Sequence, residues 1–135
     1  MSNRILVVGL GRFGTALALG LAERGSEVLA VDRLMGPVEA VKDAVTHAVE
    51  LDSTDPVALN SVEAGRCRVA VVAIGEAFEM AVLSVAALKE IGVPRILARA
   101  RNPVQARILR AVGADETIEV ETEIGRRIAE SLTSG

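Results

Sequence analysis

Short runs of apolar and β-branched residues alternate along the chain with longer stretches in which apolar residues recur at helical spacing. The short runs predict strands at Arg4–Val8, Glu27–Val31, His47–Glu50, Val69–Ala73, Arg95–Ala100 and Glu116–Ile118. The longer stretches predict helices at Phe13–Arg24, Pro37–Ala44, Pro56–Val62, Glu79–Ile91, Pro103–Val112 and Glu123–Leu132. Strands that alternate regularly with helices form βαβ units, so the sequence predicts an α/β domain built on a parallel sheet of six strands.

Length and local signals agree with one such domain. The 135 residues suit a single hydrophobic core, so we expect residues 1–135 to form one domain. Asp55 and Asn102 each stand directly before a proline, which is typical of a helix N-cap followed by proline at the first helical position. Half of the residues are apolar and only two are Phe, which suits a parallel sheet covered by helices.

The first predicted strand runs into Gly9-Leu10-Gly11-Arg12-Phe13-Gly14 and then into a helix. In a dinucleotide-binding turn the first glycine permits the tight turn, the second lets the backbone approach a pyrophosphate, and the third lets helix and strand pack closely. Asp32 follows 18 residues after Gly14, at the end of the second strand. The pair predicts a Rossmann-type, doubly wound parallel sheet with helices on both faces and a nucleotide at the turn. The alternative is a degenerate fold that keeps the glycines for packing only.

The acid at the end of the second strand also bears on the type of nucleotide. A carboxylate at Asp32 can accept hydrogen bonds from ribose hydroxyls and would repel a 2′-phosphate. Arg33 beside it weakens that inference, because an arginine can accept a 2′-phosphate. We favour a ligand with a free 2′-hydroxyl.

Other candidate ligand-binding residues follow the later strands, because ligands bind at the carboxyl ends of strands in such sheets. Arg12 could clamp phosphate oxygens or be a solvated helix-terminal arginine, and Asp52 could meet the ligand or only cap a turn. Gly75 could admit the nucleotide or be a plain loop glycine, and Arg99 could bind a phosphate or pair with an acid. The predicted nucleotide site consists of Gly9, Gly11, Arg12, Phe13, Gly14, Asp32, Arg33, Asp52, Ser53, Ile74, Gly75 and Arg99.

Composition excludes several classes of protein. A net charge of −3 and an aromatic content of 1% give neither the basic surface nor the stacking rings of a nucleic-acid-binding protein. Cys67 is the only cysteine, which fits a reducing, cytosolic compartment. No apolar run approaches a membrane span, so we expect no direct membrane insertion. No nucleophile–base–acid set or metal cluster is apparent, which predicts a binding protein and not an enzyme.

The helix expected around Ala77–Ile91 is apolar on more than one face. A helix that covers a sheet in a monomer should keep a polar outer stripe. The excess apolar surface favours a subunit interface, and the alternative is a loosely amphipathic helix that exposes some Ala and Val.

Several segments resemble the RCK/KTN family, also called the TrkA N-terminal domain, whose members are cytosolic regulators of K⁺ channels and transporters. The resemblance covers nearly the whole chain and is carried by Gly9–Gly14, Ala30–Asp32, Thr46–Val49, Asp52–Asp55, Val72–Gly75, Ile96–Ala100 and Gly113–Asp115. Within the family, the Gly-Arg-Phe-Gly form and the late Glu121 are most similar to the KtrA type, the gating-ring subunit of Ktr K⁺ uptake systems. A typical member carries a second, C-terminal regulatory domain, which we expect to be absent from this sequence.

The resemblance implies a ligand and a mechanism. KtrA-like proteins bind ATP or ADP, whereas TrkA-like proteins are associated with NAD⁺ and NADH, so both remain open. The resemblance places the γ-phosphate of ATP near Arg12, reached across a subunit interface. It also places a cation such as Mg²⁺ between subunits at Glu121, for which the alternative is an acid that complements the helix dipole.

The resemblance also implies partners and a location. It predicts a homodimer that assembles into a higher-order ring, bound to a membrane K⁺ channel or transporter subunit, and cytoplasmic but peripheral to the inner membrane. Two other functions use the same fold. One is the cofactor domain of an NAD-dependent dehydrogenase, which would need a substrate domain. The other is a redox-sensing repressor, which would need a basic DNA-reading module.

Overall fold

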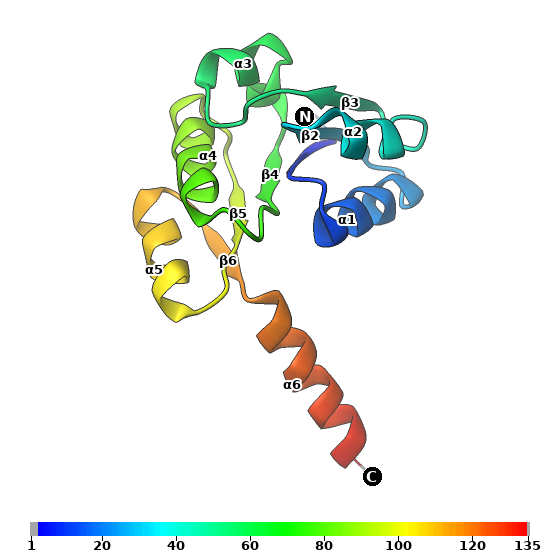
Figure 1. Ribbon diagram of the computed structural model, residues 1–135, viewed down its shortest axis with the longest axis vertical. Helices are drawn as coiled ribbons and strands as arrows, with labels where there is room; N and C mark the ends of the chain where they lie inside the picture. The colour runs from blue at the N-terminus through cyan, green and yellow to red at the C-terminus, as the bar shows by residue number, and fades with distance from the viewer. Residues whose placement is uncertain (1–2, 135) are drawn as a thin grey trace.

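The computed structural model describes residues 3–134 and contains a six-stranded parallel sheet in the order β3-β2-β1-β4-β5-β6. The ends of the predicted domain at Met1, Ser2 and Gly135 lie outside the described residues. From β1 the chain moves outward to β3, then crosses back to place β4 on the other side of β1 (Figure 1). This doubly wound order confirms the predicted Rossmann-type sheet. The strands are β1 (Arg4–Val8), β2 (Glu27–Asp32), β3 (His47–Glu50), β4 (Val69–Val72), β5 (Ile96–Arg99) and β6 (Glu116–Ile118).

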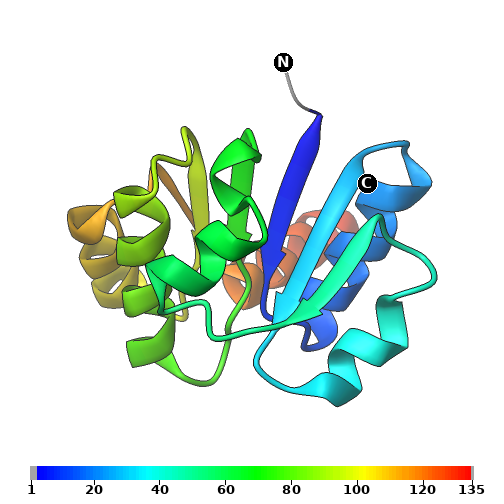
Figure 2. The same cartoon turned by 90° about the horizontal axis from the view of Figure 1, so that it is seen from above.

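Helices cover both faces of the sheet, as Figure 2 shows. One face carries α1 and α2, and the other carries α3, α4 and α5. Alternate residues of β1 serve the two sides, because successive side chains of a strand point to opposite faces. Leu6 and Val8 join the core beneath α3–α5, and Val7 joins the core beneath α1 and α2. The helices are α1 (Arg12–Glu23), α2 (Met35–Val41), α3 (Pro56–Ser61), α4 (Phe78–Glu90), α5 (Pro103–Val112) and α6 (Val120–Thr133), with a short 3₁₀ turn η1 (Ala64–Arg66).

The predicted caps are confirmed. The Asp55 carboxylate accepts a hydrogen bond from Val57 N at 2.9 Å, and the Asn102 side chain accepts one from Gln105 N at 2.9 Å. In each helix a proline occupies the first position, where no intrahelical N–H is required. These devices fix where α3 and α5 begin, and therefore where the loops after β3 and β5 lie.

Some boundaries differ from the prediction. α2 begins at Met35, two residues before Pro37, because a proline is tolerated anywhere in the first turn of a helix. α6 begins at Val120, which places Glu121 inside its first turn. The turn η1 was not predicted, since three residues are too few to show a helical period.

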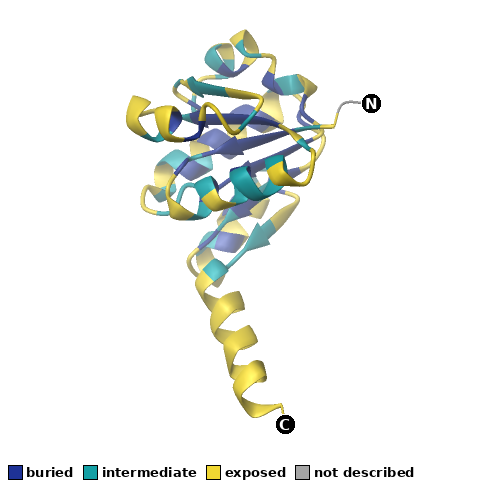
Figure 3. Ribbon diagram, turned by 90° about the vertical axis from the view of Figure 1, so that its right-hand side faces the viewer, coloured by how far each residue is buried: buried dark blue, intermediate teal, exposed yellow. Residues whose placement is uncertain are grey.

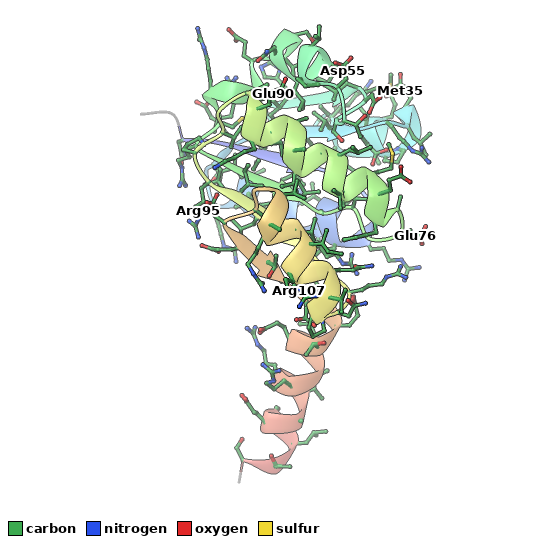
Figure 4. The ribbon with its side chains drawn as sticks, turned by 90° about the vertical axis from the view of Figure 1, so that its left-hand side faces the viewer. Met35, Asp55, Glu76, Glu90, Arg95 and Arg107 are labelled. Atoms are coloured by element: carbon green, nitrogen blue, oxygen red, sulfur yellow. The ribbon has the colours of Figure 1, made fainter. Side chains whose placement is uncertain are left out.

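Most of the apolar side chains of α4 pack against other elements of the same chain. Ala81, Val85 and Leu88 are buried against the sheet, and α5 lies beside α4 on the same face (Figure 4). Leu83 is its one large apolar side chain among the exposed large hydrophobic residues that the structure describes. The broad apolar character of α4 is therefore explained largely by its position between α3, α5 and the sheet.

The last helix behaves differently from the others. α6 projects away from the domain, and residues 121–134 are exposed along its whole length (Figures 1 and 3). Ile124, Ile128 and Leu132 follow one another at intervals of four and form an uncovered apolar stripe. Within residues 3–134, none of the helices has both the length and the apolarity that a membrane crossing requires.

Candidate functional site

A cleft of about 640 Å³ opens at the carboxyl ends of the strands, beside the neighbouring strands β1 and β4 at which the strand order reverses. Its volume lies within the usual range for small-molecule sites. Ten of the twelve predicted residues line it, namely Gly9, Gly11, Arg12, Asp32, Arg33, Asp52, Ser53, Ile74, Gly75 and Arg99. Phe13 and Gly14 do not line the cleft and instead support the residues that do.

The glycine turn forms the floor of this cleft. Gly9 has a φ of 94°, a left-handed conformation that favours glycine, and its N–H donates to Val31 O at 2.9 Å. A Cβ on Gly14 would collide with the carbonyl oxygen of Gly9, so only glycine lets α1 pack this closely on β1. Gly11 has open space where its Cβ would be, and no side chain caps α1 at that residue. The backbone N–H groups that begin α1 are therefore accessible to an anion in the cleft.

Asp32 at the tip of β2 holds the rim of the cleft together. Its Oδ2 accepts a hydrogen bond from Leu10 N at 2.7 Å, and its Oδ1 accepts one from Leu34 N at 2.9 Å. Each carboxylate oxygen can accept a further hydrogen bond, so the group still has capacity for ribose hydroxyls. Arg33 lines the cleft beside it and is exposed.

The loop after β3 carries the next two predicted residues. Asp52 Oδ1 accepts hydrogen bonds from Thr54 Oγ1 at 2.6 Å and from Thr54 N at 2.9 Å. These bonds from Thr54, assisted by the positive charge of Arg33, hold the pKa of Asp52 below its usual value. Asp52 therefore closes its own turn, which was the alternative interpretation, while it also lines the cleft. Ser53 beside it is buried, and its hydroxyl lies 2.7 Å from that of Ser84, which is fully buried on α4.

Arg99 connects four segments at the far side of the cleft. Its guanidinium lies over the ring of Phe13, 5.5 Å from the centroid, and Nη2 donates to Glu121 Oε2 at 2.7 Å. A Cβ on Gly75 would lie 3.1 Å from Arg99 Nη1, so glycine leaves the room that the guanidinium occupies. The hydrogen bond from Arg99 holds the pKa of Glu121 below its usual value.

Nine further residues line the cleft, among them the charged Glu76 and Arg101 and the apolar Met80. Arg101 and Glu76 follow the ends of β5 and β4, so the rule that found Arg99 and Gly75 would have found them too. Met80 carries no chemical signal in the sequence. The cleft thus combines arginines at positions 12, 33, 99 and 101 with acids at positions 32, 52 and 76.

The cation site at Glu121 does not fit this chain alone. Among residues 3–134, no three His, Cys, Asp or Glu side chains gather closely enough to hold a metal ion. Glu121 is also already paired with Arg99, whose charge neutralises the carboxylate. A hard cation prefers six or more oxygen ligands, so further ligands would have to come from elsewhere.

The cleft therefore fits an anionic nucleotide by its own geometry: open N–H groups at a helix start, a carboxylate at the tip of β2, and arginines around the rim. This fold and this glycine turn define a Rossmann-type domain of the nucleotide-binding class. The sequence pattern of the TrkA-N domain matches residues 5–120, and the chain belongs to this family. The predicted family is confirmed.

Two proteins of Bacillus subtilis (strain 168) are similar over nearly the whole chain. Ktr system potassium uptake protein C is 35% identical over 134 residues, which cover 99% of this chain and 61% of that protein. Ktr system potassium uptake protein A is 36% identical over 132 residues, which cover 98% of this chain and 60% of that protein. The chain thus spans about 60% of the length of these relatives.

Solved structures agree on the fold. The TrkA-N domain of the inner membrane protein ybaL from Escherichia coli has a TM-score of 0.86 at 21% identity, covering 98% of both chains. The GsuK channel bound to NAD has a TM-score of 0.81 at 17% identity, covering 94% of this chain and 23% of that one. GsuK bound to ADP has a TM-score of 0.83 at 17% identity, covering 99% of this chain and 35% of that one.

Proposed function

We propose that this chain is the nucleotide-sensing regulatory domain of a K⁺ uptake channel or transporter. The observation that carries the proposal is the cleft itself, which is lined both by the open backbone at Gly11 and by the carboxylate of Asp32. The similarity of the chain to the two Ktr system potassium uptake proteins supports the link to K⁺ transport. We propose a binding role for the cleft, because its lining supplies groups that would position a nucleotide.

The ligand we propose is ATP or ADP, with NAD⁺ or NADH as the alternative. GsuK has been solved with ADP and with NAD, so this fold accommodates both kinds of ligand. In this chain Arg99 and Arg101 both line the cleft. Two guanidinium groups favour a phosphate chain over an uncharged nicotinamide carboxamide, which supports ATP and ADP.

Each predicted residue then has a role. The backbone at Gly9 and Gly11 would approach the phosphates, and Asp32 would accept hydrogen bonds from the ribose. Arg33, Asp52 and Ser53 would lie on the adenosine side of the cleft. Ile74, Gly75 and Arg99 would lie on the phosphate side, with Phe13 and Gly14 beneath them.

Regulation would follow from differential binding. A ligand shifts a conformational equilibrium only by the difference between its affinities for the two states, and such coupling is typically about 1–3 kcal/mol. We propose that ATP contacts the Arg12 guanidinium through its γ-phosphate, and that ADP, which lacks this phosphate, makes a weaker contact. Arg12 is exposed at the first position of α1, so it can reach a phosphate in its own cleft or in that of a neighbouring chain.

Assembly and location complete the proposal. We propose a homodimer that builds a larger ring on the cytoplasmic side of the inner membrane, docked to a membrane K⁺ channel or transporter subunit. The exposed apolar side chains of α6 support association, since isolated stripes of this kind are usually covered. A cation at Glu121 would need oxygen ligands from a phosphate or from a second chain.

Calorimetric titration of ATP, ADP and NAD⁺ into the wild type and Arg12→Ala tests the proposal. We expect the wild type to bind adenine nucleotides and to prefer ATP, and Arg12→Ala to lose that preference. Arg107→Ala is the matched control, because Arg107 is an exposed arginine on α5 outside the cleft (Figure 4). An unchanged ATP preference in Arg12→Ala would remove the role of Arg12. A wild type that binds no adenine nucleotide at millimolar concentration would overturn the whole proposal.

A further inference from the structure

The Arg99 guanidinium lies between the cleft and the Glu121 carboxylate. On one side it lines the cleft, and on the other its Nη2 donates to Glu121 Oε2 at 2.7 Å. Its side chain is 23% exposed whereas that of Glu121 is 62% exposed, so the arginine belongs to the body of the domain and the glutamate to its surface. Guanidinium N–H groups bind carboxylate and phosphate oxygens with the same fork geometry.

The Phe13 ring keeps Arg99 at this position. Phe13 belongs to the glycine turn, so the guanidinium stacks on the segment that would hold the phosphates. Gly75 on the opposite side leaves space for the guanidinium, since any side chain there would crowd Nη1. The Arg99 guanidinium is thus held between the loops that carry Phe13 and Gly75. Its terminal N–H groups remain able to donate to an acceptor.

Glu121 connects this arginine to α6. Apart from this pair, no ion pair or side-chain hydrogen bond joins α6 to the remainder of residues 3–134. Residues 121–134 are exposed, and the helix projects freely from the end of β6 (Figures 1 and 3). The Arg99–Glu121 pair is therefore a direct contact through which a change in the cleft can reach α6, whereas Arg101 acts on Glu121 only through its charge.

A phosphate at Arg99 and the Glu121 carboxylate would oppose each other. Both are anions that bind guanidinium N–H groups, and like charges placed on one cation repel each other. A terminal phosphate carries more negative charge than a carboxylate, and it would also be held by the backbone at the start of α1. The phosphate therefore has the advantage in any competition for Arg99.

We propose that Arg99 is exchanged between Glu121 and a nucleotide phosphate, so that phosphate binding in the cleft releases the first turn of α6. This inference rests on the proposed function, because it takes the anion to be the phosphate chain of an adenine nucleotide. It makes Arg99 a positioning residue for α6 as well as a ligand of the phosphate. Within the described residues, the one ion pair of α6 then leads directly to the cleft.

The first test removes the internal competitor. ATP, ADP and adenosine are titrated by calorimetry into the wild type and Glu121→Gln, in buffer with a chelator so that no divalent cation takes part. We expect Glu121→Gln to bind ATP and ADP roughly two- to fivefold more tightly, the range that follows from a surface ion pair. Adenosine carries no phosphate, so its affinity should not change.

Two further variants make the result specific. Glu123 lies in the same turn of α6, and its carboxylate forms no salt bridge within the described residues. Glu123→Gln should therefore leave the ATP affinity at the wild-type value. The double variant Glu121→Gln/Arg99→Gln should not show the increased ATP affinity of Glu121→Gln, because that increase requires the arginine. Equal ATP affinity in Glu121→Gln and the wild type, or a weaker one in Glu121→Gln, would overturn the exchange.

The second readout follows α6 directly. A fluorophore is attached at Ser131→Cys, while Cys67 stays unlabelled because it is buried and burial raises the pKa of its thiol to about 11. We expect ATP, but not adenosine, to lower the fluorescence anisotropy, and Glu121→Gln to show the low value without ligand. If ATP leaves the anisotropy unchanged while calorimetry shows that ATP binds, the exchange is overturned and the proposed function stays intact. A wild type that binds no nucleotide would overturn both.

Discussion

The carboxylate of Asp32 accepts a hydrogen bond from the backbone N–H of Leu10 at 2.7 Å, so the tip of β2 holds the glycine turn that follows β1. The same carboxylate accepts a second bond from Leu34 N at 2.9 Å, which fixes the start of the loop into α2. One acid thus sets the relative position of two loops on the rim of the cleft. The ribose-binding role that we propose for Asp32 would use the same two oxygens that hold these loops.

Replacing Asp32 should therefore affect stability as well as ligand binding. We expect Asp32→Ala to lower the free energy of unfolding by about 1–2 kcal/mol, because two backbone N–H groups lose a charged acceptor. Asp32→Asn keeps one acceptor oxygen and should lie between Asp32→Ala and the wild type. Urea unfolding followed by circular dichroism measures this, and equal stability of all three proteins would contradict the bridging role.

The glycines of the turn should separate packing from ligand binding. Gly14→Ala places a methyl group against the carbonyl oxygen of Gly9, so we expect the free energy of unfolding to fall by about 3 kcal/mol. Gly11→Ala meets open space and should change stability by no more than about 0.5 kcal/mol. Its added methyl would nevertheless obstruct a phosphate, so ADP binding should weaken. Denaturation and calorimetry on both variants distinguish the two roles, and normal ADP affinity in Gly11→Ala would exclude close approach at that residue.

The hydroxyl pair of Ser53 and Ser84 should stabilise the loop after β3. We expect Ser84→Ala to lower the free energy of unfolding by about 1–2 kcal/mol, because it leaves the buried hydroxyl of Ser53 without its partner. Ser53→Ala combined with Ser84→Ala removes both groups and should recover part of that loss. The exposed Ser61 on α3 provides the control, and Ser61→Ala should change little. A double variant less stable than the sum of the single ones would refute the pairing argument.

Acid should weaken the turn at Asp52. Hydrogen bonds from Thr54 lower the pKa of Asp52 below its ordinary 3.8, so the folded state favours the ionised carboxylate. A lowered pKa in the folded state stabilises the protein above the unfolded value, and that contribution disappears as the pH falls through the folded value. We expect Thr54→Val to raise the pKa of Asp52 and Thr54→Ser to preserve it. An NMR titration of the side-chain carboxyl group between pH 2 and pH 6 (roughly the range that brackets both values) checks this. A pKa that is equal in Thr54→Val and the wild type would show that the Thr54 hydroxyl is not the cause.

The alternation of apolar runs and helical stretches determined the strands, the helices and the parallel sheet, because burial on both faces requires near-continuous apolar strands. The glycine turn, Asp32 and the caps at Asp55 and Asn102 were also readable, since each depends on neighbours only a few residues away or on a known spacing. The positions of Asp52, Gly75 and Arg99 in the cleft followed from their places after strands.

Tertiary structure alone decided what these side chains contact. The sequence could not show that Arg99 meets Phe13, Gly75 and Glu121, because these lie on four segments that only the folded sheet brings together. It could not show that Ser53 finds Ser84 in the core, or that α4 is covered while α6 stands free. Periodicity reports which face of an element is apolar, whereas the partner of that face is fixed by long-range packing. For this reason the sequence predicted residues that line the cleft but not the contacts between them.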